Sequence, residues 1–278
     1  MKLLFFGTGS IGQRHINLLL KHFDHEIYAF RSGQGVLYKN HEVKEIHSWD
    51  EVDELRPDVA FICNPTYLHI KTAIECAERG IKLFIEKPVD CSTKGLDYLL
   101  RLIVEHGIVT YVAYPFRFND AIRKFKKENK TNYLNIIRCL TNLDTWRGYQ
   151  TYSAKKSQGG GALLELSHEI DLAEYLFGEI IKLDSSLYNH GKVQTDAEEL
   201  AVLYATHRNC STHIVLDIAS GRQERSIITN SIMSYFVTDQ MYLDQLVYFF
   251  DNIDNSRMMN NLPDASILFK KIMRVRGE

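Results

Sequence analysis

Three glycines near the start of the sequence have the spacing of a phosphate-binding turn. Gly7, Gly9 and Gly12 form the string GTGSIG. Between a strand and a helix, such glycines allow a tight turn, a close approach of a pyrophosphate to the backbone, and close packing of helix on strand. The amides of Ser10 and Ile11 would then face the phosphates at the positive end of the helix dipole. The string alone also fits a purely structural turn.

A lysine and a histidine further along are candidate chemical groups. Lys87 directly follows the apolar run 81–86. A lysine at the carboxyl end of a parallel strand lies where doubly wound folds bind ligands, and it can stabilise negative charge on a reacting oxygen. His168 can take up and return a hydroxyl proton near neutral pH. Glu165 and Asp171, each three residues away, would orient the ring from one helix face. A surface lysine and a structural histidine are the alternatives.

The elements around these residues alternate in the way a parallel sheet requires. Apolar strands separated by helices predict an α/β, doubly wound Rossmann sheet over residues 1–117. A charged helix at 120–130 and the strand-like runs 198–207 and 211–219 then predict an α+β domain over 118–278. The expected strands of the first domain are 2–6, 26–30, 58–63, 81–86 and 108–114, and its expected helices begin at Ile11 or cover 66–79 and 92–105.

Composition excludes several classes of protein. The chain has 278 residues, 45% hydrophobic and 24% charged, with a formal net charge of -2, so no global attraction to nucleic acid or an anionic membrane is expected. No apolar run reaches the ~20 residues of a membrane span, and the first residues do not resemble a signal peptide, which favours the cytoplasm. The cysteines contain no C-x-x-C pair, so we expect free thiols and no metal site. They are Cys63, Cys76, Cys91, Cys139 and Cys210.

The end of the second predicted strand bears on the choice of cofactor. NAD-specific domains place an acidic residue here to bind the ribose 2'-hydroxyl. This sequence has Arg31 and Ser32 instead. Both can bind a 2'-phosphate, so we expect NADP to be preferred, with NAD as the alternative. Arg31 as a solvated surface charge is the competing interpretation.

Three further segments complete a set of motifs: NPTYLH at 64–69, EKP at 86–88 and GGGALLELSHEID at 159–171. Together with GTGSIGQRH they resemble the Gfo/Idh/MocA family of oxidoreductases over nearly the whole chain. The resemblance implies an N-terminal Rossmann domain and a C-terminal domain with an open, mostly antiparallel sheet. It also implies hydride transfer between a nicotinamide and a hydroxyl-bearing carbon of a sugar or cyclitol.

The resemblance also implies roles for individual residues. Lys87 is the active-site lysine, and His168 and Asp171 are the catalytic residues of the second domain. The common family pattern has an aspartate four residues before the histidine, whereas Glu165 lies three before it. On one helix, that change rotates the carboxylate by roughly 100°. The cofactor contacts implied beyond the glycine turn are Asn64, Pro65, His69, Glu86 and Lys87.

A basic segment before the histidine resembles a variant in family members encoded with cell-surface sugar biosynthesis. Its cations suit the carboxylate or phosphate of an acidic sugar or nucleotide sugar, and a solvated basic loop is an equal alternative. The substrate contacts expected here are Arg147, Tyr152, Lys155, Lys156 and Glu165.

These observations favour an NAD(P)-dependent dehydrogenase of a sugar, cyclitol or nucleotide sugar. One alternative is a glycosidase-type enzyme that oxidises a sugar transiently and recycles its bound NAD. The other is a cofactor-sensing regulator without chemistry. After residues 225–230 the second domain is shorter than in relatives. A homo-oligomer is therefore one alternative for the assembly state.

Overall fold

The computed structural model describes residues 1–31, 40–128, 133–143 and 151–277. The chain forms two compact units. Unit 1 consists of Met1–Ala113 and Leu246–Ala265, and unit 2 consists of Tyr114–Gln245 and Ser266–Glu278. The first unit is therefore built from two separate stretches of sequence.

Unit 1 is built on a six-stranded parallel sheet with the order β3-β2-β1-β4-β5-β6. The order changes direction between β1 and β4, which is where such sheets bind dinucleotides. The central strands β1, β4, β5 and β6 are apolar and largely buried, as the sequence predicts, whereas the edge strand β3 exposes Lys44 and Glu45. Their bounds are β1 Lys2–Phe6, β2 Glu26–Phe30, β3 Val43–Ile46, β4 Val59–Ile62, β5 Lys82–Glu86 and β6 Thr110–Ala113.

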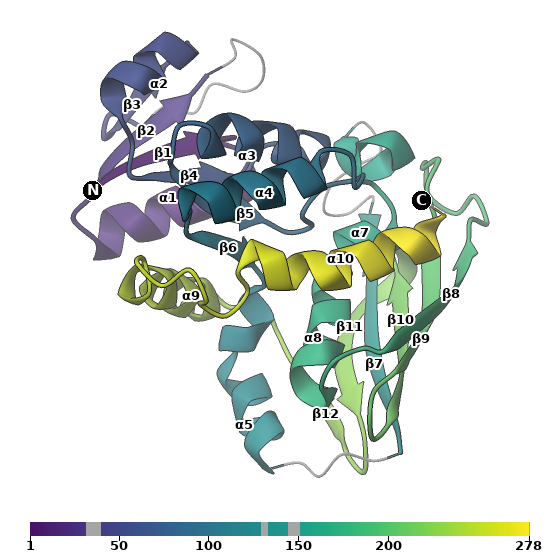
Figure 1. Cartoon of the computed structure of the whole chain (residues 1–278). Helices are drawn as coiled ribbons and strands as arrows, with labels where there is room; N and C mark the ends of the chain where they lie inside the picture. The colour runs from purple at the N-terminus through teal and green to yellow at the C-terminus, as the bar shows by residue number, and fades with distance from the viewer. Residues whose placement is uncertain (32–39, 129–132, 144–150, 278) are drawn as a thin grey trace. The chain divides into compact units, whose positions relative to one another are not determined.

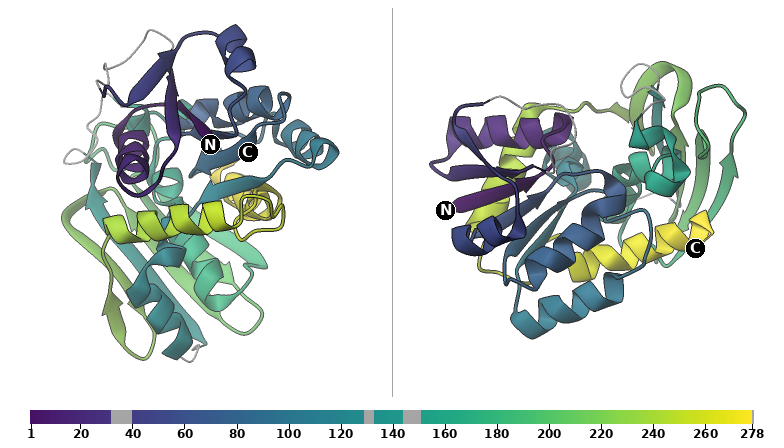
Figure 2. Two further views of the ribbon diagram at one scale, coloured as in Figure 1. Left: turned by 90° about the vertical axis from the view of Figure 1, so that its left-hand side faces the viewer. Right: turned by 90° about the horizontal axis from the view of Figure 1, so that it is seen from above.

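Helices cover both faces of this sheet. Figure 2 shows α1 on one face and α3 and α4 on the other, which confirms the doubly wound arrangement. The helical elements are α1 Ser10–His22, α2 Trp49–Leu55, η1 Thr66–Leu68, α3 His69–Ala77 and α4 Leu96–His106. Strand β3 and helix α2 were not predicted from the sequence.

A late segment of the chain completes the core of unit 1. Helix α9 (Asp239–Asp251) enters this unit at Leu246, and α10 (Leu262–Arg276) leaves it after Ala265. Phe249 is fully buried and packs edge-on against Phe84 with ring centroids 5.2 Å apart. The amide of Val112 in β6 donates to the carbonyl of Asn260 at 2.8 Å. The segment therefore supplies both apolar core and hydrogen bonds.

Unit 2 contains an open, mixed sheet with the order β12-β11-β7-β10-β9-β8 (Figure 1). Among its described strands, β10 and β7 pair in parallel and the other neighbours are antiparallel. This confirms the predicted mostly antiparallel sheet. The bounds are β7 Leu134–Asn142, β8 Lys182–Tyr188, β9 Leu200–Thr206, β10 Ser211–Asp217, β11 Ala219–Ile228 and β12 Ile232–Ser234.

Helix α8 packs against β7 and β10 of this sheet. The single helix expected after the glycine triplet is interrupted at Leu166, whose φ and ψ are -106° and 22°. The sequence therefore predicted helix at the right place but missed the break. The helical elements before α9 are η2 Pro115–Phe118, α5 Asp120–Glu128, η3 Tyr152–Ala154, η4 Lys156–Gln158, α7 Ala162–Glu165 and α8 Ser167–Phe177. Within the described residues, none of the helices combines the length and apolar character that a bilayer crossing requires.

Replacing Phe249 by alanine tests the contribution of the late segment to unit 1. Phe249→Ala should lower the free energy of unfolding by about 3–5 kcal/mol, because it leaves a cavity against Phe84. Val247 on the same helix is 42% exposed, so Val247→Ala is the matched control and should cost well under ~1 kcal/mol. Denaturant unfolding measures both. Equal costs would contradict this account of the core.

Candidate cofactor site and acid-base site

The glycine turn leaves no room for side chains at two of its three glycines. Gly7 has φ +96°, and a Cβ there would lie 2.5 Å from the amide nitrogen of Asn64. A Cβ on Gly12 would overlap the carbonyl oxygen of Gly7. Helix α1 and the end of β4 are thus packed directly on the turn. At Gly9, in contrast, a Cβ would meet nothing within 4 Å.

The start of α1 is equipped to bind an anion. Gly9 is the N-cap; within the described residues no side chain caps the helix, and its first turn carries no acidic residue. The amides of Ser10, Ile11 and Gly12 have no acceptor within the helix, and the helix dipole favours negative charge here. Open space over Gly9 beside these amides fits the pyrophosphate of a dinucleotide.

Arg31 lies over the glycine turn. It follows β2, and its Nη1 donates to Thr8 Oγ1 at 2.8 Å. Its Nε lies 3.6 Å from Oε1 of Glu45 in β3, and 12% of its side chain is exposed. The guanidinium is therefore not a freely solvated charge. Ser32, the other residue expected to bind a 2'-phosphate, lies outside the described residues. Glu45 is an acidic neighbour that the sequence analysis missed.

The residues after β5 are held by a buried pair. Glu86 Oε1 lies 2.7 Å from Nε2 of His15, with side-chain exposures of 7% and 0%. The other oxygen of Glu86 accepts from the backbone amide of Lys87 at 3.3 Å. Lys87 is half-buried, and its peptide bond to Pro88 is cis. Glu86 thus joins the start of α1 to the lysine turn. In the sequence, the position of His15 in the apolar stripe of α1 could have indicated that its side chain is buried.

His69 joins the turn after β4 to the turn after β5. Its Nδ1 lies 2.9 Å from the carbonyl oxygen of Pro88, and its Nε2 lies 2.8 Å from that of Asn64. The amide of the Asn64 side chain donates to Thr72 at 2.9 Å, and Pro65 precedes η1. The ring of His69 is therefore turned toward backbone carbonyls. His69 would therefore affect cofactor binding by holding these two turns in place.

In unit 2, His168 lies next to a buried carboxylate that the sequence analysis did not name. The imidazole packs against the ring of Phe116, with centroids 4.9 Å apart. Its Nε2 lies 3.5 Å from Oε1 of Glu169, whose side chain is fully buried. Glu169 also accepts hydrogen bonds from Arg225 Nε at 3.1 Å and from the hydroxyl of Tyr235. Adjacent helical residues rarely face each other, so periodicity gave no signal for this pair.

Charge and burial act against each other on Glu169. Burial alone would raise its pKa, but His168, Arg225 and Tyr235 together bring the pKa below its usual range. Burial also raises the pKa of Tyr235 and of the nearby Cys139 thiol, with Glu169 adding to both effects. The cluster therefore holds a carboxylate beside a neutral phenol and a neutral thiol.

The two carboxylates expected near His168 are placed differently. Asp171 is on α8 and forms a two-pronged pair with Arg117, at 2.6 Å and 3.0 Å. Burial raises the pKa of Asp171, and Arg117 opposes this effect. Glu165 ends α7 and His168 lies near the start of α8, on either side of the break at Leu166. The structure thus brings a third carboxylate, Glu169, to the histidine.

The basic segment before α7 lies on the glycine triplet. The amide of Gly161 donates to the carbonyl of Ser153, and that of Gly160 to the carbonyl of Lys155. Lys155 and Lys156 are exposed, Tyr152 is half-buried, and Arg147 lies outside the described residues. The amide of Leu163 donates to Glu198 at 3.1 Å, which fixes the start of α7.

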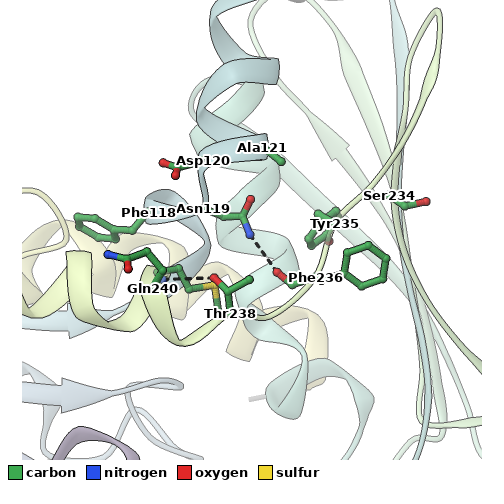
Figure 3. A pocket seen from close by; sticks show the side chains of 10 residues that line it. Phe118, Asn119, Asp120, Ala121, Ser234, Tyr235, Phe236, Thr238 and Gln240 are labelled. Carbon is green, nitrogen blue, oxygen red and sulfur yellow. Dashed lines mark hydrogen bonds between the residues drawn. The ribbon is translucent and has the colours of Figure 1, made fainter. Parts of the chain in front are cut away.

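A cavity of about 310 Å³ opens in unit 2 beside the cluster around Glu169 and Tyr235. Figure 3 shows it between the starts of α5 and α9 and the segment that follows β12. Asn119 directly precedes α5, and its side-chain amide donates to the carbonyl of Phe236 at 2.9 Å. Tyr235, which bonds Glu169, contributes to the lining. No motif in the sequence predicts this cavity.

Comparisons with known proteins agree with both halves of this geometry. Residues 1–114 match the oxidoreductase family with an NAD-binding Rossmann fold, and residues 130–242 match the C-terminal alpha/beta domain of the same family. The chain belongs to the Gfo/Idh/MocA oxidoreductase family. The resemblance stated from the sequence is thereby confirmed at the level of the family.

Individual relatives of this Gfo/Idh/MocA protein are distant. It is 26% identical over 151 residues to the 2,7-anhydro-N-acetylneuraminate hydratase of Mediterraneibacter gnavus, covering 51% of this chain and 40% of that protein. It is 23% identical over 209 residues to the myo-inositol 2-dehydrogenase of Thermotoga maritima, covering 71% and 60%. In both cases the match spans less than two thirds of the relative.

The fold extends over the whole chain. The WlbA (WbpB) dehydrogenase of Thermus thermophilus, solved with NAD and UDP-GlcNAcA, is similar with a TM-score of 0.81 and 15% identity. The likeness covers 100% of this chain and 95% of that one.

Adding one methyl group at Gly9 tests the phosphate cradle. Gly9 has φ -72°, which alanine adopts without strain, and a Cβ there enters open space. Gly9→Ala should therefore leave the melting temperature nearly unchanged but weaken NADH binding at least about tenfold, or ~1.4 kcal/mol. Gly107→Ala is the control for a glycine with open space outside the site; its positive φ predicts lower stability with unchanged NADH affinity. Unchanged NADH binding in Gly9→Ala would remove the turn from the cofactor site.

Proposed function

We propose that this chain is an NAD(P)-dependent dehydrogenase acting on a hydroxyl-bearing carbon of a sugar, cyclitol or nucleotide sugar. The observation that carries the proposal is in unit 1: an open anion-binding turn at Gly9 and a lysine fixed directly after β5 belong to one nucleotide-binding sheet. Membership of the oxidoreductase family supports it.

The chain's own groups hold the cofactor and move the proton. The amides of Ser10, Ile11 and Gly12 bind the phosphates. A nicotinamide held at this turn would supply the hydride acceptor for the carbon that carries the hydroxyl. Lys87 donates a hydrogen bond to the reacting oxygen and stabilises its developing negative charge. His168 takes the hydroxyl proton and returns it in the reverse direction.

We further propose that the substrate is an acidic sugar or a nucleotide sugar. Exposed Lys155 and Lys156, beside half-buried Tyr152, are available to a carboxylate or phosphate. Among the similar proteins are a myo-inositol dehydrogenase and a dehydrogenase solved with UDP-GlcNAcA. We infer a role in the synthesis of surface glycans on the same grounds.

Replacing Lys87 tests the proposed chemistry. Lys87→Met should lower turnover by about two orders of magnitude or more, because it removes the cation at the reacting oxygen. NADH affinity should stay within several-fold of the wild type. Reduced nicotinamide is followed by absorbance with myo-inositol, levoglucosan and UDP-GlcNAcA as probes. Lys82→Met is the matched control, since Lys82 begins the same strand and pairs with Asp254.

The outcomes separate the competing functions. Wild-type activity that persists in Lys87→Met would remove the lysine from the mechanism. Product formation without net reduction of NAD(P) would indicate a cofactor that is recycled. Tight NADH binding with no reaction on any probe, together with a response of a partner to NADH, would favour a sensor.

The preference for NADP rests on Arg31. Its guanidinium is already oriented by Thr8, and Glu45 competes with a 2'-phosphate for it. Arg31→Ala should weaken NADPH binding by about tenfold or more while changing NADH binding less than about threefold. Glu45→Gln should change NADPH affinity in the opposite direction, because it frees the guanidinium. Fluorescence titration with each cofactor checks both, and equal effects on NADH and NADPH would contradict a role in 2'-phosphate binding.

A further inference from the structure

We propose that Glu169, held as a carboxylate by Arg225 and Tyr235, is the positioning residue that orients His168 and stabilises its protonated form. The inference rests on the proposed function, because it assigns a partner to the residue that moves the proton there. It replaces the carboxylates expected from sequence spacing, Glu165 and Asp171, with the residue adjacent to the histidine.

The carboxylate of Glu169 is fixed by two donors and lies next to His168. Its side chain is fully buried, and Arg225 and Tyr235, from β11 and the segment after β12, donate to it. These donors come from elements other than α8, so they fix the carboxylate against the helix that carries it. The carboxylate also lies next to the imidazole of His168, whose Nε2 is 3.5 Å from Oε1.

The other carboxylate on α8 is already engaged. Asp171 is bound by Arg117 through both of its oxygens, with 2% of the side chain exposed. A carboxylate paired in two places with a guanidinium has its charge compensated there. Glu169 is also paired with a guanidinium, that of Arg225, but through one nitrogen, Nε. The carboxylate of Glu169 faces the histidine.

Phe116 closes this cluster. Its ring lies edge-on to His168 at 4.9 Å and to Tyr235 at 5.3 Å, and the Arg225 guanidinium lies 5.7 Å from its centre. One apolar ring therefore contacts three members of the cluster. A low-dielectric wall strengthens the attraction between Glu169 and a protonated imidazole.

The titratable groups that face Glu169 come from three elements besides α8. Cys139 in β7 and Tyr235 after β12 have pKa values raised by burial, so the thiol and the phenol keep their protons. Arg225 in β11 stays charged. Within this cluster, we therefore assign the mobile proton to His168.

In the oxidation direction the hydroxyl O–H bond breaks, its proton forms an N–H bond on His168, and its electron pair forms the carbonyl of the product. The carbon that carries the hydroxyl gives its hydride to the bound NAD(P)+. His168 gains one positive charge, which the negative charge of Glu169 stabilises. Glu169 itself neither gains nor loses a proton.

The test is the titration of His168 in the whole chain. Imidazole ¹³C-labelled protein is titrated by NMR, with the His168 signal assigned from its loss in His168→Asn. Glu169→Gln should move the titration midpoint of His168 to lower pH by about one unit or more, because it removes the adjacent negative charge. The plateau rate on the same probes should fall about tenfold or more, and the acidic limb of the pH-rate profile should move in the same direction as the midpoint.

Two variants separate this role from a structural one. Glu199→Gln is the matched control: Glu199 is buried and accepts the amides of His190 and Val193, so its loss affects stability without moving the His168 midpoint. Tyr235→Phe keeps the charge of Glu169 but removes a donor. It should leave the midpoint at or above the wild-type value, and it serves if Glu169→Gln does not fold.

An unchanged midpoint in Glu169→Gln, or a downward shift in Tyr235→Phe, would overturn the inference. If the wild type oxidises none of the probes and the midpoint still moves in Glu169→Gln alone, the coupling of the two side chains stands and the assigned reaction fails. An active wild type with equal rates in Glu169→Gln would leave the reaction in place and remove Glu169 from it.

Discussion

The absence of room for a Cβ at Gly7 and Gly12 is the constraint on which unit 1 depends. It brings the start of α1 directly against the ends of β1 and β4, so the free amides of the helix face the place where the strand order changes direction. The His15–Glu86 pair then links the same helix to the end of β5. One close backbone approach and one buried pair thus determine the relative positions of the phosphate turn and the lysine turn.

Unit 2 relies on a different device. Its helix α8 carries three ionisable side chains into the interior, and each carboxylate is matched by a guanidinium from another element: Asp171 by Arg117, and Glu169 by Arg225. Burying such charges is costly unless each is paired and hydrogen-bonded. The pairing therefore constrains where η2, β11 and α8 can lie within the unit.

Local signals in the sequence were sufficient for five strands of the first sheet, for β9 and β10 of the second, and for the glycine turn. Strand, turn and helix follow one another within a few residues there, and the apolar runs of a parallel sheet have no close alternative. The break at Leu166 and the pairing of Glu169 were not accessible in the same way. The pairing of Glu169 depends on Arg225 and Tyr235, more than fifty residues away, which no helical period records. His15 lies between these cases, since a histidine in an apolar stripe implies a buried partner without identifying Glu86.

The return of residues 246–265 to unit 1 has a consequence for synthesis. Domains generally form as the chain emerges, the N-terminal one first. Here the first sheet lacks Phe249 and the hydrogen bonds of Asn260 until almost the entire chain has been made. The nucleotide-binding unit must therefore wait for the second unit to be translated before its core is complete. A gene fragment ending after β6 would encode every glycine of the phosphate turn and still lack part of the interior that supports it.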